Sequence, residues 1–293
     1  MPASSPYNAL LARVPVARRA HDGAQARTAY WEYGDAAAPV TILAVHGFRG
    51  DHHGLEPVVA HLPEVRWIMP DLPGFGETPA LASGAHDLAT YAAWLREFAA
   101  AVAPGAVVLG HSFGSIVAAG AVADGLDTPR LILVNPIGAP ALEGPRGVLT
   151  RLAVAYYAAS AWLPRRLGSW LLRSRAIVRV MSIVMAYTRD RTLRRFIHDQ
   201  HDRYFSLFSD RDTLRQAFVT SVANDVRASA PRIAQPTLLI AAVQDDITPI
   251  AAERRLATLF PDARLVEIDG VGHLIHYEKP AEAADAIREF LGA

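Results

Sequence analysis

Short runs of Val, Ile, Leu and Ala recur along the chain, and stretches with helical spacing separate them. Several of these runs are continuously apolar, which is typical of parallel strands buried on both faces. The expected strands are residues 27–33, 40–45, 65–69, 106–109, 131–135, 236–243 and 264–268, and the helical stretches include 88–103, 115–123 and 281–291. Because strands alternate with helices, the sequence predicts an α/β fold with a doubly wound, mostly parallel sheet.

One long segment, residues 138–230, breaks this alternation. It contains no expected strand, and Pro145, Pro164 and Gly168 divide it into several helices. It holds 15 Arg against 7 Asp and Glu. We therefore predict an all-helical insertion at 138–230 that forms a cap over a core made of residues 1–137 and 231–293.

Composition excludes several classes of chemistry. The chain has 293 residues, a formal net charge of zero and no cysteine. Thiolate nucleophiles, disulfides and Cys-ligated metals are therefore excluded. Lys279 is the one lysine, so no P-loop is present, and a pyridoxal or Schiff-base enzyme is disfavoured. Zero net charge gives no whole-molecule attraction to nucleic acid or to an anionic membrane, so no nucleic-acid partner is expected.

The chain shows no sign of export or of a membrane span. Residues 1–20 lack the apolar core of a signal peptide. The longest nearly apolar run, residues 152–163, is too short to cross a bilayer. We therefore expect a cytoplasmic protein with no transmembrane segment.

The expected strand 106–109 leads into Gly110-His111-Ser112-Phe113-Gly114 and then into a helix of small residues. This is the G-x-S-x-G pattern in a strand–turn–helix setting, which exposes the serine hydroxyl on a tight turn. A glycine-rich turn with an incidental serine is the alternative, and the position after a buried strand disfavours it. A dinucleotide fingerprint fits less well, because the G-x-G-x-x-G spacing is missing. The pattern predicts that Ser112 is a nucleophile.

A serine hydroxyl needs a base to remove its proton. His273 lies in a glycine-rich loop between the expected strand 264–268 and the last helix, which is where open α/β sheets place active sites. His276, three residues further on, competes for the role. We assign the base to His273, because the flexible glycines precede it, and expect His276 to pack at the rim of the loop.

The acid that orients the base is expected where the strand 236–243 ends. Asp245 and Asp246 both follow that strand, and the order Ser, Asp, His is the chain order of α/β-hydrolases. We assign Asp245 as the acid and Asp246 as a loop or helix-capping residue.

Five groups of residues together resemble the α/β-hydrolase fold superfamily, of the serine-nucleophile type with a helical cap. They occur in the family's order from about residue 27 to the end of the chain. They are His46-Gly47-Phe48, the stretch from Asp71 to Gly76, the Ser112 pentapeptide, Asp245 with Pro249, and Gly272-His273 followed by Glu278-Lys279-Pro280.

The resemblance implies an enzyme that cleaves a carboxylic ester or similar acyl bond through an acyl-enzyme on Ser112. It implies that the backbone N–H groups of Phe48 and Phe113 form the oxyanion hole, and it implies no cofactor. The expected partner is a small apolar or acyl substrate; the oligomeric state is not indicated. Dehalogenases and epoxide hydrolases of this fold use aspartate where this chain has Ser112, so they are disfavoured. Three alternatives stay open: a carbon–carbon hydrolase of the meta-cleavage type, a cofactor-free perhydrolase, and a non-catalytic binding protein of the same fold.

Two further groups of residues suggest other roles. His198 with His201, and Asp51-His52-His53, have types and spacings that metals use, but we interpret the first as a solvated helix face and predict no metal site. Tyr157 and Trp162 lie among arginines in the expected cap, and we predict that they contact substrate. Contact of the cap with a membrane surface is the less favoured hypothesis; we expect the cap's apolar faces to pack inward and its arginines to be solvated.

Overall fold

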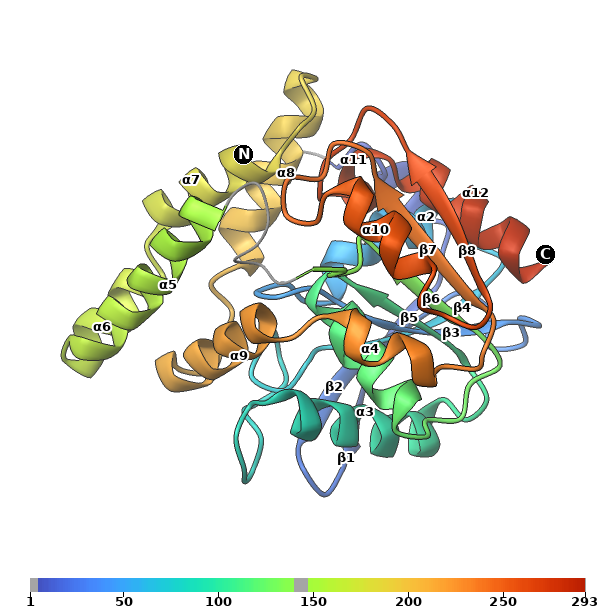
Figure 1. Ribbon diagram of the computed structural model, residues 1–293, viewed down its shortest axis with the longest axis horizontal. Helices are drawn as coiled ribbons and strands as arrows, with labels where there is room; N and C mark the ends of the chain where they lie inside the picture. The colour runs from blue at the N-terminus through green and yellow to red at the C-terminus, as the bar shows by residue number, and fades with distance from the viewer. Residues whose placement is uncertain (1–4, 140–146, 293) are drawn as a thin grey trace.

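The computed structural model describes residues 5–139 and 147–292, and within these ranges eight strands form one sheet (Figure 1). The strand order is β1-β2-β4-β3-β5-β6-β7-β8. β1 and β2 pair antiparallel, β2 and β4 pair antiparallel, and all pairs from β4 to β8 are parallel. The strands are β1 Val16–Asp22, β2 Arg27–Tyr33, β3 Thr41–Val45, β4 Arg66–Pro70, β5 Val107–His111, β6 Leu131–Val134, β7 Thr237–Ala242 and β8 Ala263–Ile268. The predicted α/β fold with a mostly parallel sheet is confirmed.

The sequence did not predict β1. This strand lies at the edge of the sheet, and none of its residues is buried. Its sequence, with Arg18 and Arg19 at its centre, lacks the apolar run that marks the inner strands. An edge strand of this kind is held by backbone hydrogen bonds to one neighbour, so its side chains carry little signal of strand structure.

Helices cover both faces of the sheet. α3 (Leu88–Val102), α4 (Phe113–Ala123) and α10 (Ile250–Ala257) share one apolar core with Leu43 and Val45 of β3. α2 (Glu56–His61) and α12 (Pro280–Leu291) share the other with Ile42 and Ala44. Successive residues of a strand point to opposite faces, so one continuous apolar run supplies both cores. Two short helices, α1 (Asn8–Leu11) and α11 (Ile275–Glu278), lie near α2.

Between β6 and β7 the described residues form helices and no named strand. Asp190 and Asp210 cap two of these helices by accepting hydrogen bonds from N–H groups of their first turns. Figure 1 shows α5, α6 and α7 extending to one side of the sheet, while α8 and α9 lie nearer to it. The helices are α5 Gly147–Trp162, α6 Arg165–Leu172, α7 Arg175–Met185, α8 Arg191–Tyr204 and α9 Arg211–Ala223, followed by the 3₁₀ turns η2 Val226–Ala228 and η3 Ala230–Arg232. We call α5–α9 the helical insertion; its predicted boundaries at 138 and 230 stay a prediction.

None of the helices in the described ranges has both the length and the apolar character needed to cross a bilayer.

The first turn of α4 lies directly against the end of β3. A Cβ atom on Gly114 would lie 2.3 Å from the carbonyl oxygen of Val45, and one on Gly110 would lie 2.4 Å from the carbonyl oxygen of Gly114. Both contacts are with backbone atoms, which cannot rotate away. Glycine at these two positions is therefore a steric requirement of the way β3, β5 and α4 pack together.

The first testable prediction concerns this close approach. Gly114→Ala should lower the free energy of unfolding by about 3 kcal/mol, because the added methyl group forces α4 away from β3. Gly54→Ala is the matched control, since a Cβ there meets only the Tyr277 hydroxyl oxygen, at 3.7 Å. It should change stability by less than about 0.5 kcal/mol. Urea denaturation measures both, and equal losses in the two variants would contradict the packing described here.

Candidate active site

The residues predicted to carry the chemistry lie at the carboxyl ends of parallel strands. Phe48 follows β3, Ser112 follows β5, Asp245 follows β7 and His273 follows β8. Parallel strands end at the same edge of a sheet, so residues far apart in the chain meet there.

Ser112, His273 and Asp245 form a continuous hydrogen-bonded chain. Nε2 of His273 lies 2.8 Å from the Ser112 Oγ, and Nδ1 lies 2.7 Å from Oδ2 of Asp245. A histidine that donates from Nδ1 to a carboxylate presents the lone pair of Nε2 to the serine hydroxyl. The structure thus brings the three predicted residues together, and the carboxylate that bonds to His273 belongs to Asp245.

The Ser112 backbone adopts a strained conformation, with φ of 54° and ψ of −118°. Left-handed φ values cost a non-glycine residue free energy, and they persist only where surrounding bonds hold them. Here the Ser112 N–H donates to the Val134 carbonyl at 3.1 Å, and the Ser112 carbonyl accepts from the N–H and the hydroxyl of Ser115, at 2.8 and 2.5 Å. These bonds fix the turn that lifts the Ser112 hydroxyl toward His273.

The Asp245 carboxylate is buried and has four hydrogen-bond donors. Oδ1 accepts from the N–H groups of Ile247 and Thr248, at 2.7 and 3.2 Å, and Oδ2 accepts from the Asn135 side chain, at 3.0 Å, as well as from His273. Burial alone would raise the pKa of Asp245, but His273 and these donors hold it below its ordinary value. Asp245 is therefore an ionised acceptor at neutral pH.

Asn135 belongs to no sequence pattern that predicted a role for it. This residue ends the expected strand 131–135 and has a left-handed backbone, with φ of 43°. Its amide orients the carboxylate that orients His273. Its position as a polar residue at the carboxyl end of a buried strand could have suggested a role in the site. Only the pairing of β6 with β7, however, places Asn135 beside Asp245.

His276 is buried and does not lie at the rim, which corrects our expectation. Its ring packs against His111, with 4.0 Å between the ring centroids. Burial lowers the pKa of both histidines, that of His111 to about 3 with a further contribution from nearby His273. Both rings are therefore neutral, and His273 is the histidine that reaches Ser112.

The two predicted oxyanion donors come from the start of α4 and from the loop after β3. Phe113 is the first residue of α4, where backbone N–H groups have no partner within the helix. Phe48 lies on the loop after β3, and its ring contacts that of Phe113 edge-on, with 6.3 Å between centroids. Within the described ranges neither N–H donates to another residue. Both donors are thus free to bind an anion.

Buried polar bonds hold the loop that carries Phe48. The neutral ring of His46 donates from Nδ1 to the Gly47 carbonyl and accepts the Leu72 N–H at Nε2. Asp71 accepts from both the N–H and Nδ1 of His52. The conformation of the loop after β3 is thus fixed by the loop after β4.

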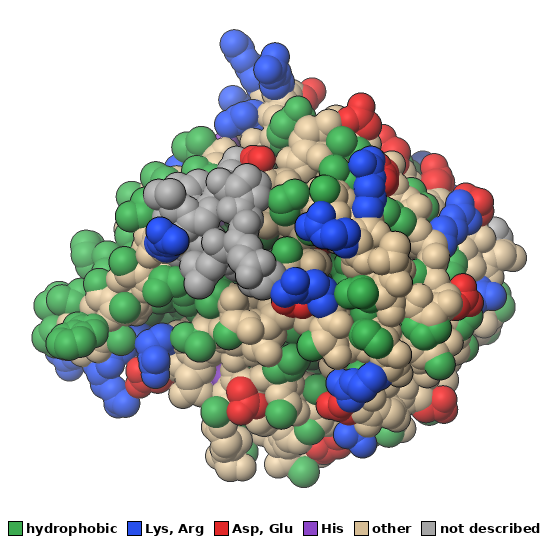
Figure 2. Space-filling view, viewed as in Figure 1, with side chains coloured by type: hydrophobic (Ala, Val, Ile, Leu, Met, Phe, Trp, Pro, Cys, Tyr) green, Lys and Arg blue, Asp and Glu red, His purple; other side chains and the backbone are tan. Residues whose placement is uncertain are grey.

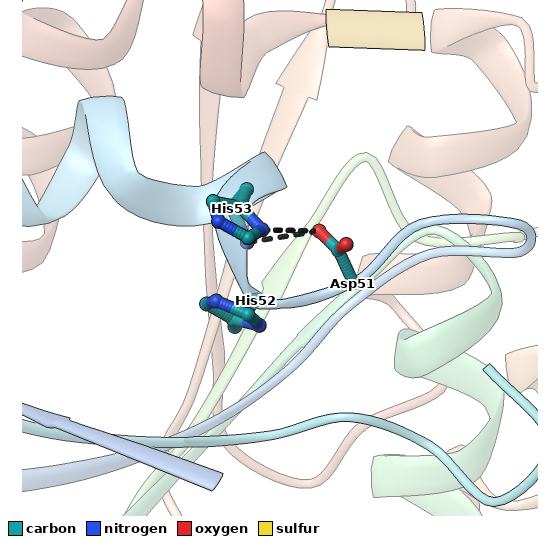
Figure 3. A group of neighbouring side chains, drawn as sticks. All are labelled: Asp51, His52 and His53. Carbon is teal, nitrogen blue, oxygen red and sulfur yellow. Dashed lines mark hydrogen bonds and ion pairs between the residues drawn. The ribbon is translucent and has the colours of Figure 1, made fainter. Parts of the chain in front are cut away.

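Asp51, His52 and His53 come from this same loop (Figure 3), and their potential ligand atoms lie within 4.8 Å of one another. Asp51 accepts from the N–H and Nδ1 of His53, while Nδ1 of His52 is bonded to Asp71 and its ring stacks on Trp31. Burial lowers the pKa of His53, but the bond to Asp51 and the nearby carboxylates of Asp51, Glu56 and Asp71 together raise that pKa above its ordinary value. These contacts explain the cluster as a support of the loop.

We expected His198 and His201 of α8 to form a solvated helix face, but they do not. His201 is fully buried, and Nδ1 of both rings lies close to the Ser182 hydroxyl, at 2.6 Å for His198 and 2.8 Å for His201. Burial lowers the pKa of His201 to about 3. The pair joins α8 to α7.

A family model described as "Alpha/beta hydrolase family" matches residues 42–286, which is most of the chain. The match spans every element that positions Ser112, Asp245 and His273. The chain belongs to the alpha/beta hydrolase family.

Individual relatives of this alpha/beta hydrolase are more distant. The bifunctional biotin-biosynthesis protein BioHC of Cellvibrio japonicus is 26% identical over 264 residues, 86% of this chain, but the chain spans only about half (47%) of that protein. A pimeloyl-[acyl-carrier protein] methyl ester esterase of Aromatoleum aromaticum is 28% identical over 85% of this chain and 96% of its own length. The solved enol-lactonase of Burkholderia xenovorans superposes with a TM-score of 0.76 at 19% identity, over 94% of this chain and all of that one.

Arg49, next to Phe48 in this hydrolase, is a buried arginine with a left-handed backbone, at φ of 62°. It donates to the Phe205 carbonyl at 2.9 Å, to the Leu172 carbonyl at 2.7 Å and to the Tyr157 hydroxyl at 3.1 Å. All three partners belong to the helical insertion. Arg49 therefore joins the loop that carries a candidate oxyanion donor to three places in the insertion, a role that no sequence pattern indicated.

The two residues predicted to contact substrate lie in different places. Tyr157 is buried, and its ring stacks on that of Phe218, with 4.0 Å between the ring centroids. It also contacts the ring of Phe48, so Tyr157 packs against the loop that carries a candidate oxyanion donor. Trp162 is 91% exposed and does not line the cavity at Ser112. The expectation for Trp162 is wrong, because this residue lies on the face of α5 opposite to Tyr157 and Ser160.

The cavity at Ser112 is small, with a volume of about 50 Å³. Met185, His201 and Phe205 of the insertion close it on one side, and Leu274 and Tyr277 close it on another. A separate hollow of about 150 Å³ reaches His273 between the end of α7 and the loop after β7. A larger hollow of about 290 Å³ beside α1 lies away from the serine.

The second prediction concerns Arg49. Arg49→Met should lower the free energy of unfolding by about 3 kcal/mol, because it leaves the buried carbonyl of Leu172 and the partly buried carbonyl of Phe205 without this donor. Arg18→Met is the control, since the Arg18–Glu77 pair is exposed and should contribute less than about 0.5 kcal/mol. Urea denaturation measures both, and a small loss for Arg49→Met would show that the link to the insertion is weak.

Proposed function

We propose that this alpha/beta hydrolase is a serine esterase that cleaves a carboxylic ester or similar acyl bond. The observation that carries the proposal is the hydrogen-bonded chain from Ser112 through His273 to Asp245. The two hydrogen-bond lengths, and the order serine, histidine, aspartate, match the requirements of nucleophilic catalysis, in which a base removes the serine proton and an acid orients the base.

In the proposed mechanism, Nε2 of His273 takes the proton of Ser112 as Oγ attacks the ester carbonyl carbon. The tetrahedral oxyanion accepts hydrogen bonds from the N–H groups of Phe48 and Phe113. The alkoxide leaves with the proton from His273, and an acyl-enzyme remains on Ser112. Water then attacks this ester with His273 again as base, which releases the acid. Asp245 stabilises the imidazolium that forms in both steps.

The relatives favour an oxygen ester as the substrate, because the similar proteins include a methyl ester esterase and an enol-lactonase. The cavity at Ser112 is lined partly by Leu274, Met185, Phe205 and Tyr277, which favours an apolar group of modest size. We propose that the helical insertion acts as the cap, since Met185 and Phe205 cover Ser112. A larger substrate then requires α7 and α8 to move.

The third prediction tests the nucleophile. A fluorophosphonate probe should label the wild-type protein on Ser112, because the hydroxyl is activated by His273 and turns toward it. Ser112→Ala should remove the labelling, and Ser83→Ala, at an exposed serine outside the hydrogen-bonded chain, should retain it as the control. Mass spectrometry identifies the labelled residue, and equal labelling of wild type and Ser112→Ala would exclude this nucleophile.

The fourth prediction separates the two neighbouring acids. Asp245→Asn should lower turnover on the order of 10⁴-fold, because the asparagine supports neither the required tautomer nor the imidazolium. Asp246→Asn should retain turnover within about threefold, because the carboxylate that reaches His273 is that of Asp245. Rates with a panel of esters, lactones, thioesters and vinylogous diketones measure both effects and define the bond type. Loss of turnover in Asp246→Asn alone would show that the acid is Asp246 and not Asp245.

A further inference from the structure

The helices α5, α6 and α7 each expose large apolar side chains. Trp162 is 91% exposed and Trp170 is 70% exposed, whereas Trp31, Trp67 and Trp94 are all buried. On α6 and α7 the exposed large apolar residues recur at helical spacings of three and four. The exposed large apolar residues are Leu152, Val154 and Trp162 on α5, Leu163, Leu167 and Trp170 on and just before α6, and Val180, Ile183, Val184 and Tyr187 on and just after α7.

This exposure corrects the expectation that the apolar faces of the insertion pack inward. Tyr157 and Val178 do pack inward, but each helix also exposes large apolar side chains to solvent. We call the outer surface of α5–α7 the arm. Figure 2 shows hydrophobic side chains gathered over the arm at the left of the view, with Lys and Arg side chains at its lower edge. An apolar surface of this kind marks a binding site for a protein or a membrane.

The charge of the arm is positive, although the whole chain is neutral. Residues 147–187 contain six arginines and no Asp or Glu. Asp212 and Asp202 of neighbouring helices pair with Arg165 and Arg179. Among the described residues, Arg151, Arg166 and Arg175 make no ion pair with a carboxylate. A local excess of positive charge acts within about 8 Å at physiological salt, so a neutral total does not cancel it.

We propose that the arm binds the surface of an anionic phospholipid bilayer. Tryptophan and aliphatic side chains enter the boundary between headgroups and acyl chains, while arginine stems lie along it and their guanidinium groups contact lipid phosphates. A second copy of the chain fits less well, because an arm packed on an arm brings two arginine-rich surfaces without acidic residues together. The exposed tryptophans, which are amphipathic, are the residues that favour this interface.

The arm is continuous with the candidate active site. Val184 and Tyr187 are exposed at the end of α7, and both also line the hollow that reaches His273. If the proposed esterase function holds, a lipid-facing arm places the entrance to His273 beside the bilayer. This route favours substrates that partition into membranes, whereas bilayer binding itself needs no catalysis.

The test is binding of the full-length protein to vesicles of phosphatidylcholine with phosphatidylglycerol, compared with vesicles of phosphatidylcholine alone. Three of the five tryptophans are already buried, so a blue shift of fluorescence on binding reports on Trp162 and Trp170. We expect co-sedimentation and a blue shift with the anionic vesicles, and weaker binding to both lipids at high salt. Ser112→Ala should bind like wild type, which separates this proposal from the proposed esterase function.

Matched variants assign the binding to the arm. Arg151→Gln, Arg166→Gln and Arg175→Gln together should weaken binding by about fivefold per arginine, and Trp162→Ser with Trp170→Ser should abolish the blue shift. The controls are Arg13→Gln, Arg19→Gln and Arg96→Gln for charge, and Val16→Ser for an exposed apolar residue, 59% exposed, outside the arm. These surface changes should preserve the melting temperature. Absence of binding to anionic vesicles, or equal binding by arm and control variants, overturns the proposal. A concentration-dependent blue shift without lipid, with dimers in light scattering, overturns it in favour of a second copy.

Discussion

The contact between the first turn of α4 and the end of β3 is the constraint on which the site depends. Because Gly114 has no side chain, α4 begins against the Val45 carbonyl, and the turn before it takes the left-handed conformation that lifts Ser112. The same approach brings the start of α4 next to the loop that carries Phe48. One steric contact between backbones therefore sets both the position of the hydroxyl and that of the two N–H groups beside it.

Polar contacts extend this order outward in layers. Asn135 and two backbone N–H groups hold Asp245, Asp245 holds His273, and His273 reaches Ser112. On the other side, Asp71 and His46 fix the loop after β3. The carboxylates of Asp245 and Asp71 and the rings of His273 and His46 have hydrogen-bond partners on both of their polar atoms, which is the condition under which burial gives a rigid site and avoids a large desolvation cost. These hydrogen bonds hold Asp245, His273 and the loop after β3 in fixed positions.

The helical insertion differs from the core in how it is held. Arg49 connects its inner side to the candidate oxyanion loop through hydrogen bonds to two backbone carbonyls and to Tyr157. Its outer side exposes Trp162 and Trp170. The insertion therefore has apolar residues on two faces, one packed on the rest of the protein and one exposed. This division explains why its sequence, rich in both Arg and apolar residues, did not show which face pointed inward.

The sequence by itself determined the sheet and the candidate chemistry. Continuous apolar runs are typical of strands that are buried on both faces, so they identified the inner strands. Gly110, Ser112 and Gly114 are typical of a tight turn that few other residues tolerate, so they identified the candidate nucleophile. The edge strand β1 has no continuous apolar run, because none of its residues is buried, so its sequence did not predict a strand. Tertiary structure alone decided the roles of Asn135 and Arg49, the burial of His201 and His276, and the exposure of Trp162. Those properties depend on which strands and helices lie side by side, and the spacing of residues along one element does not contain that information.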